Sequence, residues 1–331
     1  MSRAGERDCI VGAGRMGEGM AAAFLHAGLE VTLIDFKARE ATLRAAYFEQ
    51  VRSHVEAEMQ MLVSLEVISP AQVADAMARL RVCDRDAASL DLASAPWVFE
   101  AVPEVMEAKA QCFAWLGQQC RPDAVIASTT STFLVTELAD LVPAPQRFIN
   151  AHWLNPALLM PLVEVSRSAV TDEAVVQGLM QLLRDVGKVA VQCGPAAGYI
   201  VPRIQALAMN EAARMVEEGV ASAEDIDIAI RMGFGLRFSV LGLLEFIDWG
   251  GGDILHFASR YLATAIDPRF AAPQIIGDNM ASGRNGIRDG QGFYDYRDRD
   301  VTAYRMQRLG EIKSRLQLMD MLPLPGCALQ A

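Results

Sequence analysis

Lysine and long apolar runs are scarce in this sequence. Four of its 331 residues are lysine, and the formal net charge is −11. Nucleic acids and anionic membranes are bound through clusters of lysine and arginine, so we expect neither as a partner. One local anion site is still allowed, because helix N-termini bind phosphate without a basic side chain. No apolar segment approaches the roughly 18 residues of a membrane span, and we expect no signal peptide.

The cysteines lack the spacing of a metal site or a disulfide framework. There are six of them, at positions 9, 83, 112, 120, 193 and 327. We therefore expect no metal, free thiols and a cytoplasmic protein. A chain of 331 residues that is 52% apolar is long enough for two domains whose hydrophobic cores need no disulfide or structural metal ion.

The first 35 residues read as strand, glycine turn, helix and strand. A short apolar run ends at Val11, and G-A-G-R-M-G follows from Gly12 to Gly17. Apolar residues then recur at helical spacing as far as Gly28, a predicted C-cap. A second strand over residues 30–35 ends on an acidic residue. This order predicts a βαβ unit with the glycine turn at the carboxyl end of its first strand.

The three glycines of this turn predict a dinucleotide site. Gly12 allows the tight turn, Gly14 lets the backbone approach a pyrophosphate, and Gly17 lets the helix pack closely on the strand. Asp35 is expected to accept a hydrogen bond from the ribose 2′-hydroxyl and to repel a 2′-phosphate. The sequence therefore favours NAD over NADP, although two basic residues that follow Asp35 weaken that preference.

Beyond residue 40 the sequence predicts an inserted helical hairpin and then more strands. One apolar stripe at helical spacing and the pair Ser69-Pro70 predict two helices over residues 40–80. Strand-like runs follow at 80–83, 97–101, 124–127, 148–151, 162–165 and 189–192. The pattern then becomes helical, beginning with a helix over residues 197–218. The predicted fold is α/β, a Rossmann-type doubly wound sheet (domain 1–194) followed by an all-α C-terminal domain (195–331).

A series of ordered motifs resembles the 3-hydroxyacyl-CoA dehydrogenase family over nearly the whole chain. The motifs are GAGRMG (12–17), EAVPE (100–104) followed by Lys109, ASTTST (127–132), AHWLNP (151–156), PLVEV (161–165), GYIV (198–201) and GQGFYDY (290–296). The resemblance implies oxidation of an L-3-hydroxyacyl substrate to the 3-keto product, with NAD as the cofactor. It also implies that the reaction is reversible. It further implies a homodimer formed through the C-terminal helices and a place in fatty acid metabolism.

His152 and Glu164 are the expected catalytic pair. A secondary alcohol gives up its proton only as hydride leaves the carbon, and a histidine suits that transfer near neutral pH. The imidazole needs a carboxylate to set its tautomer and to stabilise the imidazolium. The family places such a pair where His152 and Glu164 stand, and we expect each at the carboxyl end of a strand, where α/β sheets hold ligands.

Other site residues are implied by the same resemblance. Ser131 stands where the family uses a hydroxyl to hold the substrate's 3-oxygen, and a hydroxyl can serve both alcohol and ketone. Met16 is implied as a cofactor contact, and Asn155 as a substrate contact. Glu104 and Lys109 are implied beside the nicotinamide half of the cofactor, but the alternative of a charge pair on a helix over residues 104–116 stays open.

Two departures from the family concern the substrate. Pro202 stands where the family usually has an asparagine that helps to hold the substrate oxygen, and proline offers no such donor. The loop at residues 235–239 is more similar to relatives that act on free 3-hydroxy acids, the L-gulonate 3-dehydrogenase (lambda-crystallin) group and carnitine dehydrogenase. Arg237 in this loop could pair with a substrate carboxylate, or be a surface arginine. On the hairpin, acidic residues outnumber basic ones, which is a poor surface for the phosphates of coenzyme A.

Three functions therefore remain open at this point. The first is a dehydrogenase of a short-chain 3-hydroxyacyl-CoA such as 3-hydroxybutyryl-CoA. The second keeps the chemistry but takes a free 3-hydroxy carboxylic acid, like carnitine or gulonate, held by Arg237. The third is an NAD-binding protein with little activity, supported only by Pro202.

Overall fold

The computed structural model describes residues 6–322. This part of the chain divides into two compact units between Met209 and Asn210, inside helix α8 (Val201–Glu217). The domain boundary near residue 194 stays a prediction. Each unit is described by itself below.

The first unit is built on a single sheet with the strand order β3-β2-β1-β4-β5-β6-β7-β8. The strands are β1 (Arg7–Val11), β2 (Glu30–Asp35), β3 (Leu80–Asp84), β4 (Trp97–Glu100), β5 (Val125–Ser128), β6 (Phe148–Trp153), β7 (Leu162–Ser166) and β8 (Val189–Cys193). Each predicted strand is confirmed to within two residues. The first six strands are parallel, β7 runs antiparallel to β6, and β8 runs parallel to β7.

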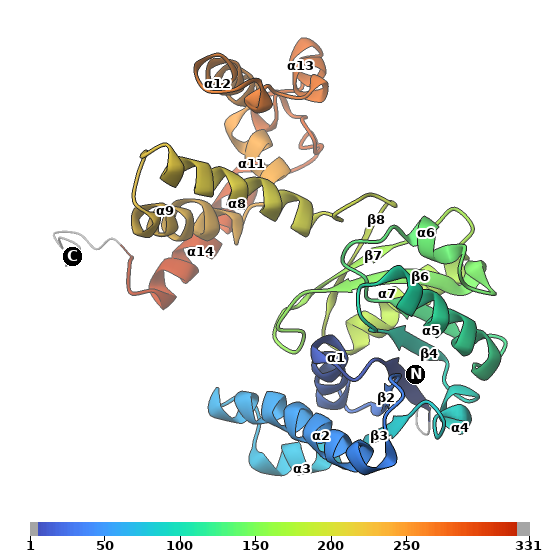
Figure 1. The fold of residues 1–331 in the computed structure, drawn as a ribbon. Coiled ribbons are helices and arrows are strands. Elements are labelled where there is room, and N and C mark those ends of the chain that lie inside the picture. Colours follow the sequence, from blue (N-terminus) through green and yellow to red (C-terminus); the bar gives the residue numbers. More distant parts are fainter. Residues whose placement is uncertain (1–5, 323–331) are drawn as a thin grey trace. The chain divides into compact units, whose positions relative to one another are not determined.

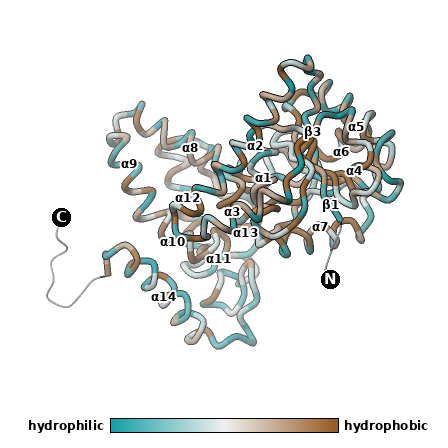
Figure 2. Tube along the Cα trace, turned by 90° about the horizontal axis from the view of Figure 1, so that it is seen from below, coloured by the Kyte–Doolittle hydropathy of each residue, from teal (hydrophilic) through white to brown (hydrophobic). Residues whose placement is uncertain are grey.

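Helices cover both faces of this sheet, as a doubly wound fold requires (Figure 1). They are α1 (Arg15–His26), α2 (Ala41–Ser64), α3 (Pro70–Met77), α4 (Ser89–Leu92), α5 (Met106–Gln119), α6 (Val135–Ala139) and α7 (Glu173–Asp185), with a 3₁₀ turn η1 at Pro145–Arg147. Alternate side chains of β1 enter two cores: Ile10 packs with α1, α2, α3 and α7, whereas Cys9 and Val11 pack with α4, α5 and α6. Figure 2 shows hydrophobic residues gathered along the strands and α1.

The predicted helical hairpin is confirmed as α2 and α3. One stripe of α2, from Val51 to Leu62, is buried against the sheet unit, and each such aliphatic side chain contributes about 1.5–3 kcal/mol. Ser69 is the N-cap residue of α3; its backbone N–H donates to Oε1 of Gln72 at 2.9 Å, as in a capping box, and Pro70 occupies the first turn.

The second unit is helical. After α8 come α9 (Ala223–Ala229), the π-helical segment η2 (Ile230–Gly235), α10 (Leu236–Phe238), α11 (Leu243–Gly250), α12 (Gly252–Ala265), η3 (Pro268–Phe270), α13 (Gln274–Ala281), η4 (Ile287–Asp289) and α14 (Val301–Leu318). The predicted helix over 197–218 begins later than expected, at Val201, because Gly198 and Tyr199 have positive φ values of 77° and 46°. The predicted cap at Ser222 is confirmed, since its hydroxyl accepts from the backbone N–H of Asp225 at 3.1 Å.

The G-Q-G-F-Y-D-Y motif is held by one buried carboxylate of the second unit. Asp248 accepts from the backbone N–H groups of Phe293 at 2.9 Å and Tyr294 at 2.8 Å, and from the hydroxyl of Tyr296 at 3.2 Å. A side chain at Gly292 would collide with this carboxylate. The motif is therefore a structural closure of the helical unit.

No helix within residues 6–322 has the length and apolar content needed to cross a membrane. The cysteines in the same part of the chain are unpaired, and Cys327 lies outside it. Burial raises the pKa of the Cys83 thiol to about 11, which keeps it protonated at neutral pH.

Candidate active site

The glycine turn between β1 and α1 has the geometry of a phosphate-binding loop. Gly12 has φ +116°, and a side chain there would collide with the carbonyl oxygen of Ala101. A side chain at Gly17 would collide with the carbonyl oxygen of Gly12, whereas the space beside Gly14 is open. Gly14 caps α1 without any side-chain hydrogen bond, which leaves the N–H groups of the first turn facing that space. The turn therefore fits a dinucleotide pyrophosphate.

Asp35 ends β2 and is buried, as expected for an acid that meets the adenosine ribose. One oxygen accepts from the backbone N–H of Lys37 at 3.2 Å, and the other pairs with Arg39. The Arg39 guanidinium also lies over the ring of Tyr47, 3.5 Å from its centroid. The Tyr47 hydroxyl donates to the carbonyl oxygen of Ala13 at 2.6 Å, so the hairpin helix α2 is bonded directly to the glycine turn.

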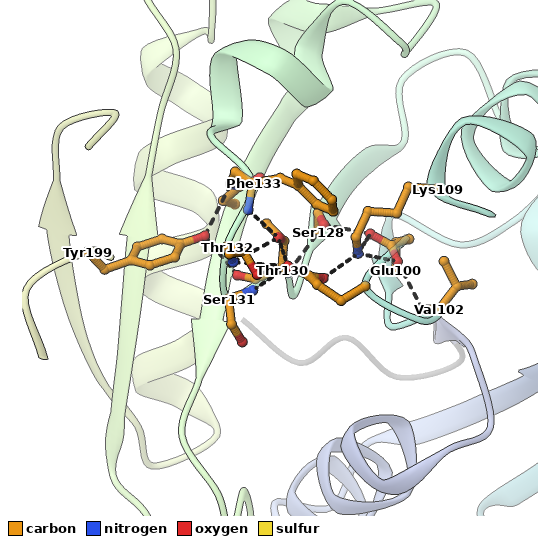
Figure 3. A network of polar contacts seen from close by, with 11 residues as sticks. Glu100, Val102, Lys109, Ser128, Thr130, Ser131, Thr132, Phe133 and Tyr199 are labelled. Atoms are coloured by element: carbon orange, nitrogen blue, oxygen red, sulfur yellow. Dashed lines mark hydrogen bonds and ion pairs between the residues drawn. The ribbon is translucent and has the colours of Figure 1, made fainter. Parts of the chain in front are cut away.

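A buried charge cluster stands behind the carboxyl ends of β4 and β5 (Figure 3). The Lys109 ammonium lies 2.9 Å and 3.0 Å from the two carboxylate oxygens of Glu100 and 3.2 Å from Oε2 of Glu104. Ser128 donates to Glu100 at 2.5 Å. Lys109 is 1% exposed, so Glu104, whose side chain is 36% exposed, is the member of this cluster that solvent reaches. Since α5 begins only at Met106, the pair is not an exposed charge pair along one helix.

Glu104 also organises the turn that carries Ser131. Its Oε1 accepts from the Thr130 hydroxyl, from the backbone N–H of Ser131 at 3.1 Å and from the backbone N–H of Thr132 at 2.9 Å. Partial burial acts to raise the pKa of Glu104, but the hydrogen bond from Thr130 and the charge of Lys109 outweigh it and lower the pKa. A charged Glu104 therefore holds Ser131 at the exposed edge of the sheet.

His152 and Glu164 form the predicted pair. Nδ1 of His152 lies 2.9 Å from Oε2 of Glu164, and the residues are 4% and 0% exposed. One part of the prediction is wrong: Glu164 is not at the carboxyl end of its strand. It is the third residue of β7, and it reaches His152 because β7 runs antiparallel to β6.

The second oxygen of Glu164 caps the start of α8. Oε1 accepts from the backbone N–H of Ile200 at 2.9 Å and of Val201 at 2.8 Å. These bonds satisfy donors that a helix N-terminus leaves open. Pro202 follows in the first turn, where its missing N–H costs nothing.

Tyr199 belongs to this site, although the sequence analysis did not single it out. Its ring stacks on the His152 imidazole with centroids 4.7 Å apart and an interplanar angle of 13°. Its hydroxyl donates to the carbonyl oxygen of Thr130 at 2.8 Å and accepts from Nδ2 of Asn150 at 3.1 Å. Burial raises the pKa of Tyr199 well above its usual value, so the hydroxyl stays a donor. A positive φ in a tyrosine costs about 1–3 kcal/mol, which these contacts must offset.

The loop after β6 is fixed by a second residue that the sequence analysis missed. The Lys188 ammonium donates to the carbonyl oxygens of Ala157 at 2.7 Å, Leu158 at 3.0 Å and Met160 at 3.0 Å. Desolvation lowers the pKa of this buried lysine. The only signal for it in the sequence was its rarity, as one of four lysines.

The remaining predicted site residues are less tightly placed. Met16 is half-buried and packs against the core at the start of α1. Asn155 is exposed in the loop after β6. Arg237 is exposed on α10 of the second unit, with its guanidinium 4.7 Å from the ring centroid of Phe246. The structure thus brings His152 and Glu164 together, and Glu104, Lys109 and Ser131.

Comparison with known proteins decides the family. The model of the 3-hydroxyacyl-CoA dehydrogenase NAD-binding domain matches residues 9–196, and that of the C-terminal domain matches residues 198–296. The chain belongs to the 3-hydroxyacyl-CoA dehydrogenase family. It is 33% identical over 300 residues to the 3-hydroxybutyryl-CoA dehydrogenase of Mycobacterium tuberculosis, covering 89% of this chain and 100% of that protein.

Two further relatives show the breadth of the family. A solved 3-hydroxyacyl-CoA dehydrogenase from Archaeoglobus fulgidus is 28% identical with a TM-score of 0.74, covering 96% of this chain and 99% of that one. The 5-formyl-3-hydroxy-2-methylpyridine 4-carboxylate 5-dehydrogenase of Mesorhizobium japonicum is 27% identical over 314 residues, covering 94% of this chain and 97% of that protein. This chain, as a member of the 3-hydroxyacyl-CoA dehydrogenase family, is an NAD-dependent oxidoreductase, and its own glycine turn fits that cofactor.

Proposed function

We propose that the enzyme oxidises the 3-hydroxyl group of an L-3-hydroxyacyl substrate to a ketone and runs the reverse reduction with the same residues. The first candidate substrate is a short-chain thioester such as 3-hydroxybutyryl-CoA. The observation that most supports this reaction is the buried pair of His152 and Glu164, joined at 2.9 Å. The name of the M. tuberculosis relative supports the thioester.

His152 acts as the general base in this proposal. An ionised Glu164 only accepts hydrogen bonds, so Nδ1 of His152 carries the proton and Nε2 keeps a free lone pair. Nε2 takes the proton of the substrate hydroxyl, and Glu164 stabilises the imidazolium that forms. Bound NAD supplies the hydride acceptor. In the reverse direction, the Nε2 proton returns to the carbonyl oxygen.

Ser131 holds the substrate oxygen beside His152. Its hydroxyl can donate to the ketone and accept from the alcohol. Pro202 stands where the family usually has an asparagine and offers no hydrogen-bond donor there, so the substrate oxygen depends on Ser131 and water. We assign Asn155 a contact to the rest of the substrate.

The cofactor spans two groups of residues in this proposal. The turn from Gly12 to Gly17, with Met16, and the carboxylate of Asp35 hold the adenosine and pyrophosphate end. Glu104 meets the nicotinamide half. Lys109 is enclosed by carboxylates and acts by fixing Glu104.

The direct test is NADH formation from NAD and 3-hydroxybutyryl-CoA, with His152→Gln as the matched variant. The amide keeps a polar side chain of similar size but cannot take a proton, so we expect kcat to fall by about 10²–10⁴-fold. NAD binding, followed by fluorescence, should stay unchanged. A variant that kept the wild-type rate would rule out His152 as the base.

A free 3-hydroxy carboxylic acid is the second candidate substrate. The arginines of α2 are both engaged with β3: Arg44 pairs with Asp84 at 2.5 Å, and Arg52 donates to the carbonyl oxygen of Leu80 at 3.0 Å. The hairpin therefore offers little positive charge to the phosphates of coenzyme A. The Mesorhizobium relative, whose name describes a carboxylate substrate, also favours this candidate.

A substrate panel separates the two candidates. Rates on 3-hydroxybutyryl-CoA, 3-hydroxybutyrate, carnitine and gulonate are compared in the wild type and in Arg237→Met. If Arg237 pairs with a free carboxylate, KM for the acids rises by roughly 10–100-fold and KM for the thioester does not. Arg231→Met, which removes another exposed arginine of the second unit, is the control. No turnover of the thioester would eliminate the first candidate.

A homodimer through the helical unit completes the proposal. Several large apolar side chains of this unit are exposed, which favours a protein interface. They include Val216, Val220, Ile228, Ile230, Phe257 and Tyr261. Light scattering after gel filtration should give twice the mass of the chain; a monomeric mass would refute the dimer.

A further inference from the structure

We propose that Tyr199 is a positioning residue that sets the placement of His152 relative to Ser131. The proposal rests on the function above, in which His152 takes the proton and Ser131 holds the oxygen. Tyr199 is 6% exposed and lies in the turn that precedes α8. Three contacts of this turn reach His152, Glu164 and the peptide group that precedes Ser131.

The first contact is with the base. The Tyr199 ring lies flat against the imidazole, 4.7 Å between centroids, with only 13° between the planes. Glu164 holds the edge of the same imidazole at Nδ1. A bond in the ring plane still allows the ring to tilt out of that plane, and a stacked face opposes that tilt. Together, Glu164 and Tyr199 define the direction in which Nε2 points.

The second contact is with the turn that carries Ser131. The Tyr199 hydroxyl donates to the carbonyl oxygen of Thr130 at 2.8 Å. That carbonyl shares a planar peptide group with the N–H of Ser131, which donates to Glu104 at 3.1 Å. The peptide before Ser131 is therefore held at both ends (Figure 3). Its position fixes where the Ser131 side chain begins.

The third contact is with the carboxylate partner. The backbone N–H groups of the next two residues, Ile200 and Val201, both donate to Oε1 of Glu164. The positive φ of Tyr199, 46°, turns the chain so that these N–H groups and the tyrosine ring face the same pair of residues. One turn thus fixes the base, its carboxylate and the hydroxyl turn against each other.

Two substitutions separate the ring from the hydroxyl. Tyr199→Phe keeps the stacked ring and removes the bond to Thr130, so we expect kcat to fall about three- to tenfold. Tyr199→Leu removes both, and a displacement of the base on the order of 1 Å lowers kcat by about a hundredfold. KM for the substrate and for NAD should stay within about twofold of wild type, because only the reacting geometry is disturbed.

The matched control is Tyr304→Phe. Tyr304 is also buried, and its hydroxyl donates to Glu245 in the second unit, remote in sequence from every catalytic residue. It should leave kcat unchanged while it lowers the midpoint of thermal unfolding to an extent like that of Tyr199→Phe. All variants are assayed as the full chain with NAD and the substrate of highest rate in the panel above.

Two results would overturn the inference. One is a Tyr199→Leu enzyme whose kcat stays within threefold of wild type. The other is a rise in KM in both Tyr199 variants with kcat unchanged, which would make Tyr199 a binding residue. If Tyr199→Leu does not fold, as judged by circular dichroism, Tyr199→Phe is compared with Tyr304→Phe instead. Equal kcat values in these two variants would overturn the inference. His152→Gln separates a failure of the proposed function from a failure of this inference. If His152→Gln is active, the proposed base is refuted. If His152→Gln is inactive and both Tyr199 variants are fully active, the positioning role is refuted and the proposed base is not.

Discussion

His152 and Glu164 are direct partners in the antiparallel ladder of β6 and β7, and their side chains are joined at 2.9 Å. Directly opposed residues in an antiparallel pair project from the same face of the sheet. The register of two strands therefore brings the carboxylate to the imidazole, and the backbone hydrogen bonds of the sheet hold them there. No loop has to order for the pair to form.

The double duty of Glu164 predicts different effects for two substitutions. Glu164→Gln keeps an oxygen for the N–H groups of Ile200 and Val201 but presents an amide N–H to Nδ1 of His152, which favours the wrong tautomer. We expect kcat to fall by about 10³–10⁴-fold with little change in the free energy of unfolding. Glu164→Ala should lose activity and also about 1–2 kcal/mol of stability, because the start of α8 is uncapped. Steady-state kinetics and urea unfolding measure the two effects; equal stability of both variants would contradict the capping role.

Asp35 should set the choice of cofactor. Asp35→Ser removes the acceptor for the ribose hydroxyl and frees Arg39 to meet a 2′-phosphate. We expect the ratio of kcat/KM for NADP to that for NAD to rise by roughly a hundredfold. Asp84→Ser is the matched control, since Asp84 ends the adjacent strand and pairs with Arg44. An equal change in both variants would mean that the loss of charge in general, and not Asp35, controls the preference.

Lys109 should stabilise the fold more at high pH than at low pH. Burial raises the pKa of Glu100 above its usual value, and the Lys109 ammonium counters that rise. A carboxyl with a raised pKa in the folded state costs stability as the pH climbs from the unfolded pKa through the folded one. Lys109→Met raises the pKa of Glu100 in the folded state further, so the variant loses more unfolding free energy at pH 8 than at pH 5. At neutral pH we expect a loss of about 3–5 kcal/mol.

A double variant is the control for this charge cluster. Glu100→Gln removes the buried charge that Lys109 compensates, so Lys109→Met combined with Glu100→Gln should regain part of the lost stability at pH 8. Urea unfolding at both pH values measures it. A loss in Lys109→Met that did not vary with pH would point to packing of the lysine stem, and not to charge.

Ser131 should hold the substrate oxygen without help from residue 202. Ser131→Ala is expected to lower kcat/KM by about a hundredfold, and Ser131→Thr, which keeps a hydroxyl, by much less. Adding Pro202→Asn to Ser131→Ala returns an amide donor near the oxygen and should recover at least a threefold part of the loss. If Pro202→Asn alone lowers the rate of the wild type, the proline itself belongs to the working site.

The strands, the glycine turn and the hairpin could be read from the sequence because each has a local pattern. Apolar runs mark the strands, three glycines mark the turn, and Ser69-Pro70 marks the start of α3. Motif order was likewise enough to find His152 and Glu164. The direction of β7 could not be read, because a five-residue apolar run looks the same in a parallel and an antiparallel strand.

The sequence by itself therefore determined the family and the cofactor, and it predicted that His152 and Glu164 pair, since these depend on short motifs in a fixed order. Only the tertiary structure decided that Lys109 is enclosed between two carboxylates, that both arginines of α2 are engaged with β3, and that Tyr199 stacks on His152. The reason is physical. Burial, charge pairing and ring stacking depend on residues that come from different elements of the chain, such as Lys109 with Glu100 and Tyr199 with His152. No local pattern encodes which of these distant groups will meet.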